Sequence, residues 1–226
     1  MAKHSKRYAE AAVRVDRDLN YEPVEAFDLL KSLPAPKFDE TVEVCVRLGV
    51  DPRKSDQLVR GAVSLPKGLG KTVTVVVFAE GDKAEAAKAA GADEVGSAEL
   101  AAKIQGGWMD FDVAVASPDM MRVVSKLGRM LGPKGLMPSP KAGTVTPDVV
   151  TAVKEYSAGK LEYRNDDGGN IHCIIGKMSF PEEDLLANLE HFVGTIQKIK
   201  PAAAKGQYVK KLVVSGTMTP GIQIAL

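Results

Sequence analysis

The sequence contains very little cysteine and no long apolar run, and both absences limit the kind of protein it encodes. Cys45 and Cys173 are the only cysteines and lie far apart, so a disulfide scaffold is not expected, and reduced thiols are typical of the cytosol. The longest apolar run, at 73–79, is too short to cross a membrane. The basic N-terminal segment lacks the apolar centre of a signal peptide. The sequence therefore predicts a cytoplasmic protein that does not associate with a membrane.

The sequence also lacks the patterns of a metal site or an enzyme. The histidines, His4, His172 and His191, have no metal-ligand spacing with the cysteines. GLGKT at 68–72 ends like a phosphate-binding loop, but the full motif needs a glycine where Leu65 stands and a helix after it. No dinucleotide fingerprint and no nucleophile elbow are present. We therefore expect no catalytic residue, no metal and no cofactor, and the chain is not expected to be an enzyme.

One long segment, between Asp119 and Asp148, has no acidic residue and is rich in glycine and proline. Its basic residues are Arg122, Lys126, Arg129, Lys134 and Lys141. Because the whole chain is nearly neutral, with 30 Lys+Arg and 29 Asp+Glu, positive charge has been segregated rather than accumulated. Segregated positive charge on a glycine-rich backbone favours a polyanionic partner such as nucleic acid. A solvated surface loop without function is an equally valid interpretation.

Hydrophobic periodicity predicts two different styles of structure along the chain. Helices are predicted at 5–17 and 22–33, and alternation of apolar and polar residues at 41–48 predicts a strand with one buried face. In the middle of the chain, strands and helices alternate, which predicts a small parallel sheet with right-handed crossovers. One of its helices is predicted at 118–131. From Gly159 onward the first style returns.

This change of style predicts an α/β fold with two domains. Residues 1–67 and 160–226 would form a discontinuous α+β domain of split βαβ type. Residues 68–159 would form an inserted Rossmann-like, three-layer α/β domain. The two linkers carry Gly68, Gly70 and Gly159, which we interpret as hinge residues. In the terminal domain a helix at 180–200 is predicted, with Ser179 and Glu182 as a capping box, and Thr146 is predicted to cap the last helix of the inserted domain.

Five segments resemble, in the same order, the family of bacterial large-subunit ribosomal protein one. They are KFDETVEV at 37–44, SDQLVRGAVSLPKGLGK at 55–71, GGWMDFD at 106–112, LGRMLGPKGLMPSPKAGTV at 127–145 and SGTMTPG at 215–221. The resemblance implies a first domain, made from both termini, that binds the mobile-stalk segment of large-subunit ribosomal RNA. It also implies repression of the protein's own operon through a messenger RNA that mimics this site, and assistance to transfer RNA leaving the exit site. We expect a monomer when the protein is free.

The resemblance also implies a set of RNA-contact residues. They are Glu25, Lys37, Phe38, Thr41, Thr217 and Met218. The stiff threonine side chains suit fixed hydrogen bonds to RNA, whereas Phe38 and Met218 would supply apolar cover, with a place in the hydrophobic core as the alternative for each. Lys37 would contact phosphate, and Glu25 would accept from a 2′-hydroxyl or remain a solvated helix residue. Thr219 stands where the family has glycine.

Further basic residues are expected to contact RNA more weakly. In the terminal domain these are Lys6, Arg7 and Lys211, and in the acid-free segment the secondary RNA contacts are Arg129, Lys134 and Lys141. Two other functions are weighed against RNA binding. One is a nucleotide-dependent transferase that uses the inserted α/β domain. The other is a protein-interaction module that docks a partner through the glycine- and proline-rich loop.

Overall fold

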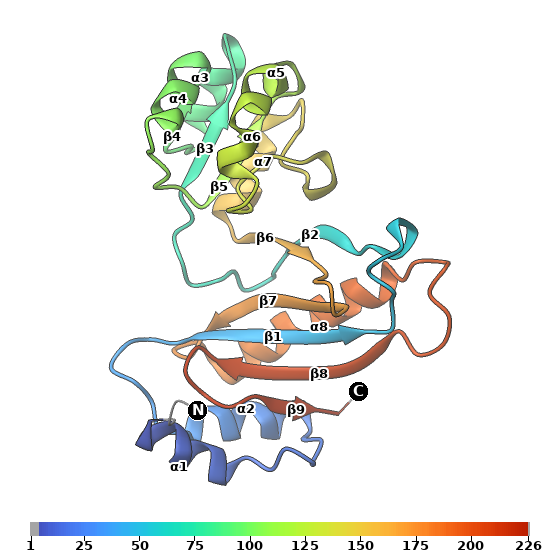
Figure 1. Cartoon of the computed structure of the whole chain (residues 1–226). Helices are drawn as coiled ribbons and strands as arrows, with labels where there is room; N and C mark the ends of the chain where they lie inside the picture. The colour runs from blue at the N-terminus through green and yellow to red at the C-terminus, as the bar shows by residue number, and fades with distance from the viewer. Residues whose placement is uncertain (1–4, 226) are drawn as a thin grey trace. The chain divides into compact units, whose positions relative to one another are not determined.

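The computed structural model describes residues 5–225, and the chain falls into two compact units. Unit 1 combines Met1–Gly70 with Tyr163–Leu226, and unit 2 consists of Lys71–Glu162. Each unit contains its own sheet (Figure 1). The predicted mixture of helices and sheets is confirmed. Of the helices that the structure describes, none is long and apolar enough to span a membrane.

Unit 1 is built on a four-stranded antiparallel sheet. Its strands, in order across the sheet, are β7 (Asn170–Lys177), β1 (Thr41–Leu48), β8 (Val209–Gly216) and β9 (Ile222–Ile224). The even-numbered residues of β1 are buried and its odd-numbered residues are half-buried or exposed, because successive side chains of a strand point to opposite faces. The alternation predicted at 41–48 is therefore confirmed.

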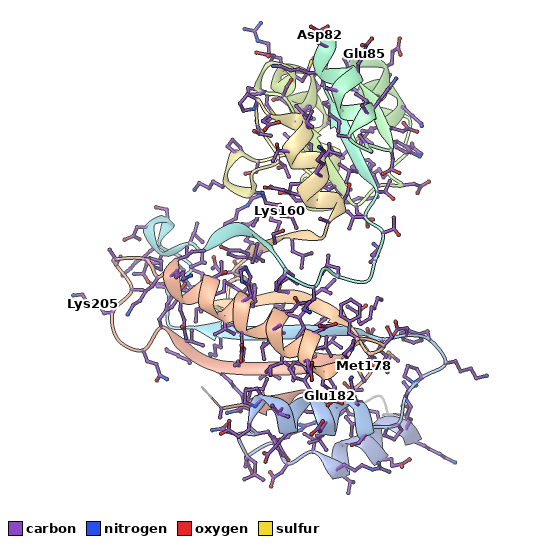
Figure 2. The ribbon with its side chains drawn as sticks, turned by 180° about the vertical axis from the view of Figure 1, so that it is seen from behind. Asp82, Glu85, Lys160, Met178, Glu182 and Lys205 are labelled. Carbon is purple, nitrogen blue, oxygen red and sulfur yellow. The ribbon has the colours of Figure 1, made fainter. Side chains whose placement is uncertain are left out.

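Two helices cover the buried face of this sheet, α2 (Pro23–Ser32) and α8 (Glu182–Lys198). Helix α8 packs on β7, while α2 packs on β8, β9 and α8. Figure 2 shows α8 in front of the sheet, with Glu182 at one end and Lys205 beyond the other. The short helix α1 (Lys6–Arg14) is tied to α2, since the Arg14 guanidinium donates to the Ser32 carbonyl at 3.3 Å.

Three smaller elements complete unit 1 or lead out of it. They are the 3₁₀ turn η1 (Ser55–Gln57) and the strands β2 (Arg60–Ser64) and β6 (Lys160–Arg164). Strands β2 and β6 form a two-stranded sheet of their own. The division between the two units falls within β6.

Unit 2 is built on a three-stranded parallel sheet in the order β4-β3-β5. Its main elements are β3 (Val75–Phe78), α3 (Asp82–Ala89), β4 (Glu94–Gly96), α4 (Ala98–Gln105), β5 (Val113–Ala116) and α7 (Val149–Ser157). Every residue of β3 is fully buried, as a continuous apolar run predicts for a strand covered on both faces. One core includes residues of α4, and the other includes residues of α3 and α7.

The helix predicted at 118–131 has the predicted bounds, but it is not one regular α-helix, because the segment alternates between short 3₁₀ and α-helical elements. These are η2 (Pro118–Met120), α5 (Met121–Val124), η3 (Ser125–Leu127) and α6 (Gly128–Leu131). The Ser125 hydroxyl donates to the Met121 carbonyl at 2.5 Å, and such back-bonding bends helices. Val124, Leu127 and Leu131 are nevertheless fully buried, so the segment still contributes to the core.

The two predicted caps are also wrong. Helix α7 begins at Val149, and its cap is Asp148, whose carboxylate accepts from the Thr151 N–H at 3.2 Å. Thr146 instead accepts from the Asp148 N–H at 3.2 Å. Helix α8 follows Pro181 without a side-chain cap. Ser179 is engaged elsewhere, because its hydroxyl donates to Asp39 at 2.8 Å.

Candidate nucleic-acid interface

Three strands of unit 1 begin or finish at the same end of the sheet (Figure 1). Strand β1 begins at Thr41 opposite Lys177, the last residue of β7, and Gly216, the last residue of β8, lies opposite Val42. Residues preceding β1 and residues following β8 therefore meet there. We call residues 37–41, Lys177 and residues 216–219 the strand-end surface.

Thr41 and Thr217 are joined by two hydrogen bonds across this surface. The Thr217 Oγ1 accepts from the Thr41 N–H at 3.2 Å and donates to the Thr41 carbonyl at 3.4 Å. The Thr41 hydroxyl accepts from the Lys177 ammonium at 2.8 Å. Both hydroxyls are thus held in place, and each keeps hydrogen-bonding capacity for a ligand. The structure brings together the two threonines that the family resemblance implies as RNA contacts.

Two large apolar side chains flank the threonines and face solvent. Phe38 is 52% exposed and Met218 is 49% exposed. The alternative reading of Phe38 and Met218 as core residues is therefore wrong. Their exposure leaves apolar surface next to fixed hydroxyl groups. This combination suits a ligand that carries both hydroxyl groups and flat apolar faces, as sugars and bases do.

The loop after β8 is a tight turn closed by Thr219. The Thr219 hydroxyl accepts from the Gly216 N–H at 2.7 Å, and the Thr219 N–H donates to the Gly216 carbonyl at 3.3 Å. Thr219 is half-buried, so its hydroxyl faces the backbone of its own loop. The departure from glycine at this position therefore closes the turn, and Thr217 and Met218 remain exposed at its tip.

The other predicted contacts of unit 1 are more scattered. Lys37 is exposed within the strand-end surface, Glu25 is exposed in the first turn of α2, and in α1 Lys6 is exposed and Arg7 half-buried. Lys211 pairs opposite Arg47 in the sheet. That position lies at the other end of β1, about 20 Å from Thr41 by the rise of a strand. The structure does not bring Lys211 to the strand-end surface.

Sequence reasoning missed two residues of this surface, Lys177 and Glu40. Every second residue before Lys177 in this strand is buried, namely Ile171, Cys173 and Ile175. Strict alternation would therefore have placed Lys177 in the core. An irregularity between Val42 and Glu43 shifts the register of β1 against β7 and leaves Lys177 half-buried beside Thr41. Glu40 precedes a strand in a polar segment and gave no sign of burial, yet it is only 1% exposed.

The basic segment of unit 2 is exposed but anchored. Its basic residues Arg122, Lys126, Arg129, Lys134 and Lys141 are all exposed. A short 3₁₀ turn, η4 (Pro140–Ala142), is held by the buried Tyr156, whose hydroxyl donates to the Ala142 carbonyl at 2.6 Å. Burial raises the pKa of Tyr156, with smaller contributions from Glu162 and Glu155, so this donor stays protonated at neutral pH. The hydrogen bond to Ala142 therefore fixes the C-terminal part of the segment, while its cationic side chains remain exposed.

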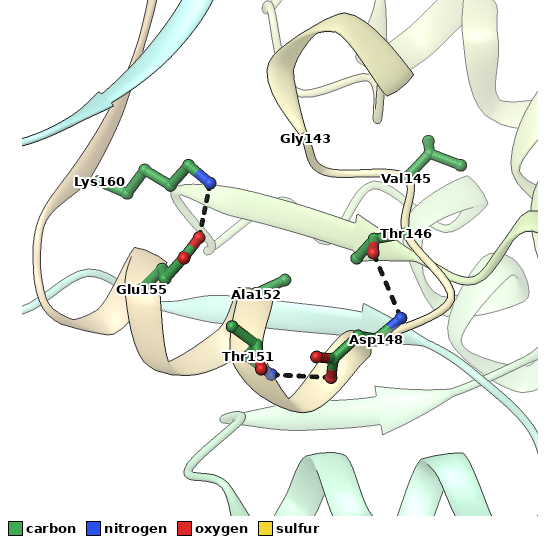
Figure 3. Close-up of a pocket in the computed structure, with 8 residues that line it drawn as sticks. All are labelled: Gly143, Val145, Thr146, Asp148, Thr151, Ala152, Glu155 and Lys160. Carbon is green, nitrogen blue, oxygen red and sulfur yellow. Dashed lines mark hydrogen bonds and ion pairs between the residues drawn. The ribbon is translucent and has the colours of Figure 1, made fainter.

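A hollow of about 290 Å³ lies beside α7 (Figure 3). Its charged groups are already engaged: the Lys160 ammonium contacts Glu155 at 2.6 Å, and Asp148 caps α7 through Thr151. Hydrogen bonds from Thr151 hold the pKa of Asp148 below its usual value. This hollow offers no free charge to a ligand and contains no assembled set of reacting groups.

The enzyme alternative finds no support in the described residues. Residues 68–72 are followed by strand β3 rather than a helix, and Lys71 is paired with Asp112 at 2.7 Å, so this segment lacks the helix N-terminus that a phosphate-binding loop needs. The Cys45 Sγ lies 3.9 Å from His172 Nε2, but burial and the nearby Asp166 raise the pKa of that thiol. Within residues 5–225, no group of three or more His, Cys, Asp or Glu side chains could hold a metal ion.

The comparison with known protein families gives one clear result. The model described as the ribosomal protein L1p/L10e family matches residues 29–220. This range contains the whole strand-end surface and the whole of unit 2. The match supports a structural role in the ribosome and binding to large-subunit ribosomal RNA.

Proposed function

Because the chain belongs to the ribosomal protein L1p/L10e family, we propose that its strand-end surface binds the folded stalk segment of large-subunit ribosomal RNA. The observation that carries this assignment is the double hydrogen bond between Thr41 and Thr217, at 3.2 and 3.4 Å, flanked by the exposed side chains of Phe38 and Met218. It is a rigid group of hydroxyls next to apolar surface.

This arrangement suits structured RNA more than a protein or a small molecule. Folded RNA is recognised through its shape, its 2′-hydroxyls and its phosphates. The Thr41 and Thr217 hydroxyls can exchange hydrogen bonds with 2′-hydroxyls, and Phe38 and Met218 can exclude water from those bonds. Lys37 and Lys177 supply positive charge for phosphate, and Lys177 has no carboxylate partner among the described residues. Its remaining two N–H groups are free to donate.

A messenger RNA that folds like the stalk segment would bind the same surface. Shape-based recognition does not distinguish two RNAs that present the same backbone and hydroxyls. We therefore propose that the protein represses translation of its own operon by occupying such a mimic, in competition with ribosomal RNA. Excess free protein would then reduce its own synthesis.

The exposed cations of unit 2 supply a second, weaker contact. Arg129, Lys134 and Lys141 are proposed to touch the transfer RNA that leaves the exit site. Charge of this kind binds phosphate without sequence preference, which suits a contact that must form and break in every cycle. The hydrogen bond from Tyr156 to Ala142 supports this role, because it fixes the base of the segment.

Filter binding with a transcript of the stalk segment tests the main proposal. The protein should bind the transcript and a transcript of its operon leader with mutual competition. Tight binding of both transcripts at once, without competition, would contradict a shared surface. Failure to bind the stalk transcript at all would contradict the proposed function.

A further inference from the structure

Glu40 is a buried carboxylate directly beneath the strand-end surface. It is only 1% exposed, although its neighbours in the chain are the exposed Asp39 and the half-buried Thr41. Its backbone carbonyl accepts from the Met178 N–H at 2.9 Å. Its side-chain Oε2 accepts from the Met218 N–H at 3.1 Å. Glu40 thus connects the segment before β1 to the turn that carries Thr217 and Met218.

Packing alone does not account for a carboxyl group at this position. The second oxygen, Oε1, is buried and has no hydrogen-bond partner in the described part of the chain. Burial of a polar atom without a partner is unfavourable, and an apolar side chain of similar size would avoid that cost. What the carboxylate contributes, and an apolar side chain could not, is an acceptor for the Met218 N–H, so its role should be sought in the turn.

The turn is built around this carboxylate. A Cβ atom added at Gly216 would lie within 2.4 Å of the Glu40 Oε2 and 3.2 Å from the Thr219 Oγ1. Only glycine lets the backbone approach the carboxylate so closely. Gly216, Glu40 and Thr219 therefore fix the backbone of residues 216–219 from both sides, while Thr217 and Met218 remain exposed at the tip.

We propose that Glu40 is a positioning residue for RNA binding. Its carboxylate does not touch RNA. It holds the Met218 N–H and so sets the turn in the conformation that directs the Thr217 hydroxyl and the Met218 side chain to the ligand. This inference rests on the proposed function of the strand-end surface. It states that the buried Glu40 keeps the exposed turn at residues 216–219 in its binding conformation.

The first test compares Glu40→Ala with Glu43→Ala. Glu43 lies three residues further along the chain, in β1, is exposed, and loses the same charge on substitution. With a stalk transcript as probe, Glu40→Ala should weaken binding on the order of tenfold, because a mobile turn must be ordered on binding. Glu43→Ala should bind like the unmodified protein. Glu40→Gln should keep most of the affinity, because its amide oxygen can still accept from the Met218 N–H.

Two further readouts separate positioning from a general loss of stability. The slope of affinity against salt should be the same for Glu40→Ala and the unmodified protein, because no phosphate contact is removed. Hydrogen exchange of the Met218 amide should accelerate in Glu40→Ala, while amides in β1 and α8 stay protected. A loss of affinity that only follows the unfolded fraction would overturn the inference.

Gly216→Ala provides a second route that keeps the carboxylate. The added methyl group should displace Glu40 and weaken binding about as much as Glu40→Ala does. In the double variant, Gly216→Ala should cause no further loss beyond Glu40→Ala, since coupled residues are non-additive. Additive losses would overturn the inference, as would a Glu40→Ala variant that binds as tightly as Glu43→Ala. If the unmodified protein itself does not bind the transcript, the proposed function fails instead.

Discussion

The Asn188 side-chain amide donates a hydrogen bond to the Gly68 carbonyl at 3.1 Å. The same amide donates to the Ile175 carbonyl at 2.8 Å, and its oxygen accepts from the Lys67 N–H at 3.0 Å. Asn188 is fully buried in α8. The first linker is thereby fastened to unit 1 as far as Gly70, where an added Cβ would lie 2.6 Å from the Phe180 ring.

This attachment bears on the hinge predicted at Gly68, Gly70 and Gly159. Each of these glycines has a positive φ, which other residues rarely adopt. Gly68 is held through its carbonyl by Asn188, and Gly70 packs against the Phe180 ring. A hinge in the first linker is therefore expected after Gly70, while Gly159, which follows α7, remains a candidate for the second linker.

Replacing Asn188 by leucine should destabilise unit 1 strongly. The substitution would leave the buried Ile175 carbonyl, the half-buried Gly68 carbonyl and the Lys67 N–H without their partner. We expect a loss of about 2–4 kcal/mol in the free energy of unfolding. Urea unfolding followed by circular dichroism measures this. The control is Lys67→Ala, which removes a partly exposed ion pair with Asp184 and should change stability little. Equal effects of the two substitutions would contradict the role given to Asn188.

Thr217→Val should weaken binding of the stalk transcript by about 1–3 kcal/mol. Valine keeps the shape but removes the hydroxyl that serves both Thr41 and the RNA, so a hydrogen-bonding group is left unpaired at the interface. Filter binding measures the change. Thr195→Val is a matched control, because the Thr195 hydroxyl only bonds within α8, to the His191 carbonyl. Unchanged affinity of a folded Thr217→Val protein would remove Thr217 from the site.

The dependence of affinity on salt should identify which lysines contact phosphate. Each contact contributes on the order of −0.7 to −0.9 to the log–log slope. Lys177→Ala and Lys37→Ala should each reduce the magnitude of the slope by the contribution of about one phosphate contact. Lys211→Ala should leave it unchanged in titrations from low to moderate salt, because Lys211 lies at the far end of β1. A flat response for the unmodified protein would indicate a protein partner rather than RNA.

The cations of unit 2 should matter for transfer RNA but not for the stalk segment. A triple variant, Arg129→Ala with Lys134→Ala and Lys141→Ala, should keep the affinity for the stalk transcript and lose affinity for transfer RNA. The reason is that these exposed side chains belong to unit 2, whereas the strand-end surface belongs to unit 1. A parallel loss for the two RNAs would indicate that the basic segment contributes to stalk binding.

Local periodicity was enough to predict β1 of unit 1 and β3 of unit 2. Strand β1 alternates because one face is covered, and β3 is continuously apolar because both faces are covered. Helix ends were predicted less well, because Thr146 and Ser179 are good caps in isolation but bind Asp148 and Asp39 instead. Such competition between nearby partners depends on the folded chain and is not visible in a short window of sequence.

The candidate site could be predicted only through the family resemblance. Thr41 and Thr217 are 176 residues apart in sequence, and no local pattern indicates that they pair. Lys177 was missed because an irregularity in β1 changes the register of its neighbour. Glu40 was missed because a carboxylate in a polar segment is normally exposed, and its burial depends on the close approach of Gly216.

The most direct test of the strand-end surface is a map of backbone amide signals with and without the stalk transcript. We expect the largest changes at residues 37–41, Lys177 and residues 216–219, with Thr41, Thr217 and Met218 prominent among them. Unchanged signals at those positions, together with changes concentrated at residues 129–141, would contradict the proposed site.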